Sequence, residues 1–82
     1  MYQIISCNIN AEGIDLKYKL YATLQLGGSV SYSIQIEKGE EVAMLRDAAD
    51  SYKSARELFD MLVHGSVTPV TAFDILEDWL LR

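Results

Sequence analysis

"IDLKYKLYATLQLGGSVSYSIQIEK", residues Ile14 to Lys38, carries the strongest structural signal in the chain. Apolar and polar residues alternate on both sides of a Gly-Gly-Ser segment. Alternation with a period of about two residues places every second side chain on one face of a β-strand. The stretch therefore predicts a β-hairpin with one buried face. The inward set would be Leu16, Tyr18, Leu20, Ala22, Leu24 and Leu26 on the first strand and Val30, Tyr32, Ile34 and Ile36 on the second.

The link between the two strands constrains their register. A two-residue turn at Gly27 and Gly28 would set the leucines of one strand beside the serines of the other. A shift of one residue restores apolar pairing, because successive side chains point to opposite faces. We therefore predict that Leu26 lies opposite Val30, across a three-residue loop at residues 27–29 with a glycine at positive φ.

The segments on either side of the hairpin extend the sheet. Before it, the β-rich run YQIISCNIN (residues 2–10) leads into a turn at residues 11–13. After it, a turn at residues 38–41 leads into VAMLR, residues 42–46, which is predicted to be a short last strand. Short links join strands that are neighbours in sequence, so the sheet is predicted to be an antiparallel meander.

Beyond the sheet, the apolar period becomes that of an α-helix. Asp50 is the predicted N-cap of a first helix, and Gly65 is predicted to follow its end at the C′ position. Thr68 and Pro69 then predict the N-cap and first residue of a second helix. The two apolar faces would be Tyr52, Ala55, Leu58, Phe59 and Leu62 on the first helix and Ala72, Phe73, Leu76, Trp79 and Leu80 on the second.

These elements predict an α+β fold in a single domain spanning residues 1–82. An antiparallel three- to four-stranded meander (1–47) would be covered on one face by a C-terminal two-helix hairpin (50–64 and 68–81). The predicted core holds Leu16, Tyr18, Leu20, Leu24, Tyr32, Ile34, Ile36, Leu58, Phe59, Leu62, Phe73, Leu76 and Trp79.

Composition narrows the function classes. Half of the 82 residues are apolar, as in a globular protein, and the net charge is −5. Seven Lys and Arg residues do not supply the basic surface that nucleic acid or an anionic membrane requires. The first residues lack the basic segment of a signal peptide, and a lone Cys7 allows no internal disulfide. We therefore expect a cytoplasmic protein that binds neither nucleic acid nor a membrane.

Three carboxylates, Asp74, Glu77 and Asp78, lie on the predicted last helix. They could bind a partner protein or, with water completing the coordination, a divalent cation. The simpler interpretation is a solvated helix face on which Asp78 pairs with Arg82. Acidic residues near a helix C-terminus oppose the helix dipole, and this interpretation leaves that feature unexplained.

The chain contains none of the common catalytic or metal-binding motifs. The glycines of LGGS link two strands and do not open a helix as a phosphate-binding loop would. Cys7 and His64 could be imagined as a nucleophile pair, but Cys7 falls at a core-facing position and His64 at a helix end. We therefore expect no enzyme activity and assign no catalytic, cofactor or metal-binding residue.

The tail SVTPVTAFDILEDWL, residues 66–80, resembles the C-terminal signature of a family of small bacterial proteins of unknown function. In that signature a VTP or VSP start leads into a helix ending D-[VI]-[VIL]-E-D-[FW]-L. The match falls on residues 67–69 and 74–80. Because the family is itself uncharacterised, the resemblance implies no activity.

We expect a non-enzymatic protein-interaction module. Its binding surface would be either the acidic helix face or the outer sheet face, with Lys17, Lys19, Tyr21 and Thr23. The alternative is a small metal-dependent regulator or enzyme that uses the acidic face or Cys7. Because a meander of this size leaves two strand edges open, a homodimer formed through a sheet edge is a further expectation.

Overall fold

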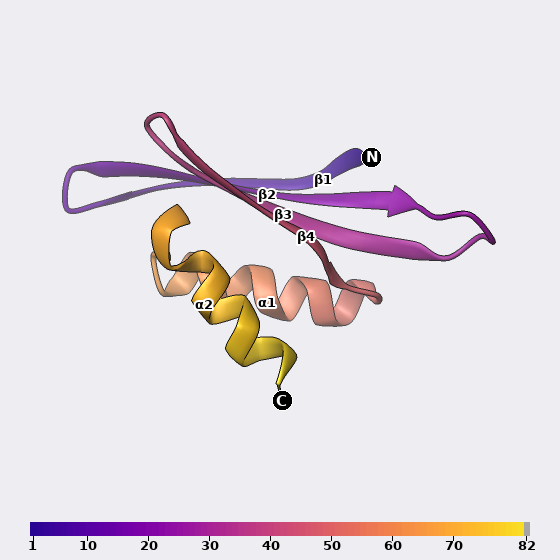
Figure 1. The fold of residues 1–82 in the computed structure, drawn as a ribbon. Helices are drawn as coiled ribbons and strands as arrows, with labels where there is room; N and C mark the ends of the chain where they lie inside the picture. Colours follow the sequence, from indigo (N-terminus) through magenta and orange to yellow (C-terminus); the bar gives the residue numbers. More distant parts are fainter. Residues whose placement is uncertain (82) are drawn as a thin grey trace.

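The computed structural model describes residues 1–81 and confirms the predicted α+β architecture. Four antiparallel strands follow the order β1-β2-β3-β4 across one sheet, and two helices come after them (Figure 1). Both helices lie on the same face of the sheet (Figure 1). The elements are β1 (Tyr2–Ala11), β2 (Ile14–Leu24), β3 (Val30–Lys38), β4 (Glu41–Ala49), α1 (Tyr52–His64) and α2 (Pro69–Leu80).

The central β2–β3 hairpin keeps the predicted faces but not the predicted register. Val30 lies opposite Leu24 and not Leu26, so the predicted pairing was wrong by two residues. The backbone N–H of Gln25 donates to the carbonyl of Ser29 at 2.7 Å, which leaves residues 26–28 as the loop. Gly27 and Gly28 both have positive φ, where the prediction required this of one glycine. Leu26, which was predicted to face inward, is fully exposed. A shift of two residues preserves the inward face, so the core pattern is unaffected.

A β-bulge explains an irregularity in β1. The pairing with β2 shifts between Gln3 and Ile5, which leaves Ile4 as an extra residue. Beyond the bulge, Ile5, Cys7 and Ile9 pack against the core while the residues between them are exposed. One inserted residue thus restores the alternation that Ile4 breaks.

The last strand is longer than predicted because a second irregularity lets it continue. Between Leu45 and Ala49 the pairing with β3 shifts, and Asp47 takes a left-handed φ of 51°. The N–H of Asp47 donates to Oγ of Ser33 at 3.1 Å, and the Asp47 carboxylate accepts from Oγ of Ser31 at 2.7 Å. Side chains of β3 therefore replace ladder hydrogen bonds at this point, and pairing resumes at Ala49.

The ends of α1 each differ from prediction by one residue. Ser51, not Asp50, is the N-cap, and its hydroxyl accepts from the N–H of Ser54 at 3.2 Å. At the other end Ser66, not Gly65, takes the left-handed conformation, with φ of 49°. The N–H of Val67 donates to the carbonyl of Leu62, and the N–H of Ser66 donates to that of Val63. These two bonds form a Schellman motif with Gly65 at the C-cap.

The second helix begins where predicted. Thr68 is its N-cap and Pro69 its first residue, but the Thr68 hydroxyl makes no capping bond to a backbone N–H. The inward side of α2 is formed by Pro69 and Ala72, which are buried, with Ile75, Leu76 and Trp79 partly buried against the core.

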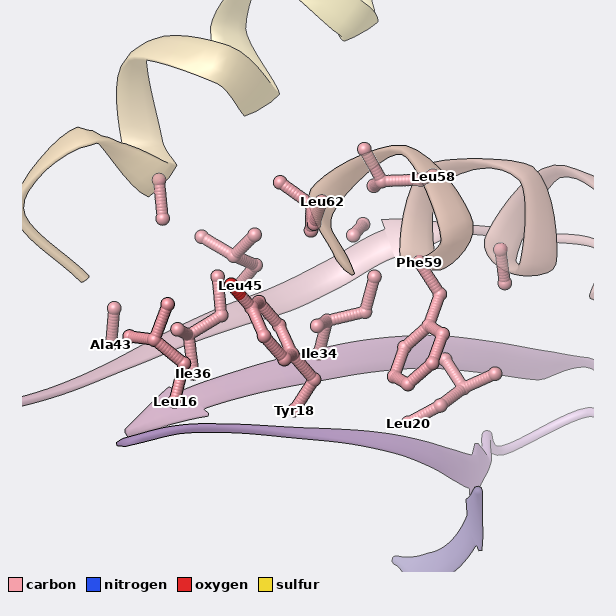
Figure 2. Packing of buried hydrophobic residues seen from close by; sticks show 13 residues of the cluster. Leu16, Tyr18, Leu20, Ile34, Ile36, Ala43, Leu45, Leu58, Phe59 and Leu62 are labelled. Atoms are coloured by element: carbon pink, nitrogen blue, oxygen red, sulfur yellow. The ribbon is translucent and has the colours of Figure 1, made fainter. Parts of the chain in front are cut away.

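The core lies between the helices and β2, β3 and β4. Tyr18 is fully buried, and its hydroxyl donates to the carbonyl of Val67 at 2.8 Å, which ties the sheet to the link between the helices. Figure 2 shows Phe59 reaching from α1 toward Tyr18 and Leu20. The rings of Phe59 and Tyr18 pack edge to face, with their centroids 6.5 Å apart. The buried residues are Leu16, Tyr18, Leu20, Ala22, Ile34, Ile36, Ala43, Leu45, Ala48, Ala55, Leu58, Phe59, Leu62 and Ala72.

Two residues predicted for the core are exposed. Leu24 is 69% exposed because the β2–β3 hairpin extends past the helices (Figure 1). Phe73 is 54% exposed because α2 turns Pro69, Ala72 and Trp79 inward instead. Tyr32, Leu76 and Trp79 are only partly buried.

Candidate functional site

The outward side of α2 combines acidic and apolar side chains. Asp74, Glu77 and Asp78 are all exposed, on the side away from the core. Phe73 and Leu80 are exposed beside them, although both were predicted to lie on the inward stripe. We name the exposed set the α2 outer face: Val70, Phe73, Asp74, Glu77, Asp78, Leu80 and the following Leu81.

Helix geometry explains this arrangement. Residues that are three or four positions apart share one side of a helix, so Val70, Phe73 and Glu77 form one row. The helix contains more apolar residues than one inward stripe can hold. Its packing against β4 and β3 uses the row from Pro69 through Ala72 to Trp79, and the surplus apolar residues face outward.

Two hollows flank Trp79. The larger, of about 420 Å³, lies between the C-terminal part of α2 and the end of β4, with Asp47 and Asp50 in its wall. The smaller, of about 180 Å³, lies between the two helices, with Asp78 in its wall. The larger is lined by Ser31, Asp47, Ala48, Ala49, Asp50, Ser54, Trp79 and Leu80, and the smaller by Met61, Ile75, Asp78 and Trp79.

The charged residues described on α2 and in the adjoining hollow are all acidic. The helix carries Asp74, Glu77 and Asp78 and no basic residue, and the adjoining hollow adds Asp47 and Asp50. The predicted pairing of Asp78 with residue 82 lies outside the described residues. Within residues 1–81 no group of three or more His, Cys, Asp or Glu side chains is arranged to hold a metal ion. The three carboxylates of α2 therefore share a face without converging on one point.

The outer sheet face has a different character because its charges are compensated. Lys19 Nζ lies 3.1 Å from Glu37 Oε2, and both side chains are about three-quarters buried. A hollow of about 570 Å³ at one end of this face is bordered by charged residues of both signs, namely Asp15, Lys17 and Glu37. The predicted candidates Lys17, Lys19, Tyr21 and Thr23 do share this face.

Cys7 and His64 take the positions expected of structural residues. Cys7 lies on the inner side of β1 opposite Tyr18, and His64 is exposed in the last turn of α1. Burial of Tyr18, with a smaller contribution from nearby Cys7, raises the pKa of its hydroxyl to about 12. The raised pKa reflects a neutral phenol held in the core, where it donates to a backbone carbonyl.

Sequence reasoning located the acidic residues of this surface but missed their neighbours. Val70 could have been found by counting apolar residues in α2, since they exceed one stripe. Asp47 and Asp50 carry no local signal, because only the path of β4 into α1 brings them beside Trp79.

Comparisons with known proteins identify a family but no function. The sequence profile of a family of unknown function (DUF6514) matches residues 2–82. No curated protein and no solved structure matches the chain. Among residues 1–81, neither helix is long and apolar enough to cross a membrane.

Proposed function

This chain belongs to the DUF6514 family, and we propose that it is a non-enzymatic protein-interaction module of the cytoplasm. Its binding surface is the α2 outer face. Its partner is a protein segment that presents apolar side chains together with Lys or Arg.

The observation that carries this proposal is the exposure of large apolar side chains beside carboxylates on one helix. Val70, Phe73 and Leu80 are 73%, 54% and 62% exposed. Burying an exposed Leu or Phe side chain fully contributes roughly 1.5–3 kcal/mol. Few such contacts are needed for a measurable affinity, even after the cost of ordering the partner.

The charge of the surface indicates what the partner carries. Asp74, Glu77 and Asp78 lie beside the exposed apolar residues, and Asp47 and Asp50 border the hollow next to Trp79. A Lys or Arg side chain in that hollow would lie beside the Trp79 side chain and the carboxylates of Asp47 and Asp50, and both kinds of group attract a cation. Such a partner would also offset the unfavourable position of Glu77 and Asp78 near the helix C-terminus.

Affinity capture of the tagged chain from its native cells tests the proposal. The informative variant reverses the charge of the surface with Asp74→Lys, Glu77→Lys and Asp78→Lys, and a second removes an apolar contact with Phe73→Ala. We expect both variants to lose proteins that the wild type captures. The matched control makes the same charge change at exposed residues elsewhere, with Glu12→Lys, Glu40→Lys and Glu57→Lys.

The control separates a specific surface from net charge. If the control loses the same proteins, the captured set reflects overall charge and not the α2 outer face. If the α2 variants retain every protein that the wild type captures, the proposal is wrong.

A further inference from the structure

The sheet has two open edges, and they differ in charge. The edge strand β1 runs for ten residues, YQIISCNINA, without a charged residue or a proline. Exposed backbone N–H and C=O groups along such a strand are a template for pairing with another strand. The other edge, β4, carries Glu41, Arg46 and Asp47 and is interrupted by an irregularity at Asp47. Charges and irregular backbone both protect an edge. The edge strand β1 has only the bulge at Ile4, near its start, whereas β4 has both features.

The helices leave the inner side of β1 partly uncovered. They pack mainly over β2, β3 and β4. Ile5, Cys7 and Ile9 point toward the helix side, yet all three remain partly exposed. In the middle of β2 and β3, by contrast, inward residues such as Leu20 and Ile34 are fully buried. An apolar strip therefore borders the uncharged edge.

We propose that β1 pairs with β1 of a second copy of this chain. The two strands run antiparallel about a two-fold axis perpendicular to the sheet, so that the four strands of each copy form one continuous sheet. This symmetry keeps the helices of both copies on the same face. The strips of Ile5, Cys7 and Ile9 from the two copies then lie side by side in the furrow between the two helix pairs.

The absence of charge on β1 and the alternation of its side chains suit this edge to a second copy. Two copies with a net charge of −5 repel each other, and the repulsion is least where an uncharged strand meets an uncharged strand. Inner residues of β1 face inner residues of its copy when the axis passes through Ser6, Cys7 or Asn8, because side chains alternate with a period of about two. A self-complementary edge of this kind is what a two-fold interface requires.

A double variant, Ser6→Glu with Asn8→Glu, tests the pairing without threatening the fold. Both residues are exposed on the outer face, opposite Lys19 and Lys17 of β2, so the new carboxylates gain cross-strand partners within the chain. In the dimer, each of the three axis positions places a new carboxylate opposite another. The matched control, Arg46→Glu, makes the same change of two charge units at an exposed position on the β4 edge.

Sedimentation equilibrium measures the outcome. We expect the wild type and the β4 control to dimerise, and the β1 variant to dissociate with a dissociation constant at least about tenfold higher. Circular dichroism should show that all three chains are folded. A wild type that stays monomeric up to millimolar concentration, or a β1 variant that dimerises as well as the wild type, would overturn the proposal.

Hydrogen exchange of the wild type locates the edge without any substitution. Raising the protein concentration should slow the exchange of the β1 amides that point away from β2, while β4 amides stay unchanged. Protection that appears along β4 or α2 instead would assign the dimer to another surface and reject the pairing through β1.

Discussion

The two helices are almost equal in length but differ in how they are held. Helix α1 buries Ala55, Leu58, Phe59 and Leu62, has a serine N-cap that accepts a backbone N–H, and ends in a Schellman motif. Helix α2 buries only Pro69 and Ala72, lacks a side-chain capping bond and has no basic residue in its last turn. The first helix is built into the core, whereas the second retains apolar and acidic surface that its own packing does not use.

The largest difference should appear when one large side chain is truncated on each helix. Leu62→Ala removes a fully buried side chain and should lower the free energy of unfolding by about 3 kcal/mol. Phe73→Ala removes a side chain that is 54% exposed and should cost less than about 1 kcal/mol. Urea denaturation of the two variants measures both values. Equal losses would show that α2 is as deeply integrated into the core as α1.

The buried hydroxyl of Tyr18, which bonds the link between the helices, should make the free energy of unfolding fall at alkaline pH. The folded state raises the pKa of Tyr18 from 10.0 to about 12, because burial favours the neutral phenol. This contribution is fully present below pH 10 and is lost as the pH rises toward 12. The two-unit difference corresponds to about 3 kcal/mol in all, at about 1.4 kcal/mol per pKa unit, and about 2 kcal/mol of it should be lost by pH 12.

The variant Tyr18→Phe isolates that effect from the titration of other groups. It removes the hydrogen bond to Val67, which should cost about 1 kcal/mol at neutral pH, and it has no phenol to ionise. Urea midpoints measured for both chains between pH 9 and pH 12 should therefore converge and then cross, so that the variant is the more stable chain at pH 12. Parallel pH curves would show that Tyr18 ionises equally easily in the folded and unfolded chain.

The N-caps provide a third contrast. Ser51→Ala removes the oxygen that accepts the N–H of Ser54 and should destabilise the protein by about 1 kcal/mol. Thr68→Ala should destabilise the protein by only a few tenths of a kcal/mol, because the Thr68 hydroxyl accepts no hydrogen bond from a backbone N–H of α2. Thermal unfolding of the two variants is sufficient to rank them. A larger loss at Thr68 would indicate that its hydroxyl caps the helix in solution.

The same contrast explains which predictions from the sequence succeeded. Strand alternation identified Tyr18, Leu20, Ile34 and Ile36 as buried although the hairpin register was wrong by two residues. The inward face depends only on parity, whereas the register depends on loop geometry that the sequence leaves open. For α1 the prediction held for Ala55, Leu58, Phe59 and Leu62, which are buried. It was wrong for Tyr52, which begins the helix and is 44% exposed.

The sequence could not predict the orientation of α2 to the same degree. Its apolar residues extend around more than one side, so periodicity placed Phe73 and Leu80 inward although both are exposed. The inward side of α2 is set by its packing against β4, which brings Pro69, Ala72 and Trp79 against the core. Tertiary contacts of this kind are not visible in the local sequence pattern. The carboxylates were correctly placed outward, because a charged residue is rarely buried without a partner.

The smallest expected effect concerns the carboxylates at the end of α2. Glu77→Gln with Asp78→Asn should stabilise the isolated chain by roughly 0.5 kcal/mol, because negative charge near a helix C-terminus opposes the dipole. Asp74→Asn lies further from that end and should change stability less, since the dipole effect is confined to about the last turn. Urea denaturation at low and high salt checks the cause, because screening should remove the gain.

Affinity capture with the Glu77→Gln, Asp78→Asn variant tests whether the cost of these carboxylates to stability is linked to binding. If the double variant is more stable than the wild type but captures its partners less well, the carboxylates impose a cost on folding that only binding offsets. If it is less stable, Glu77 and Asp78 make stabilising contacts within the chain, and their position needs no partner to explain it. The first outcome would show that α2 differs from α1 in function as well as in packing: α1 stabilises the fold, whereas the outer face of α2 binds a partner.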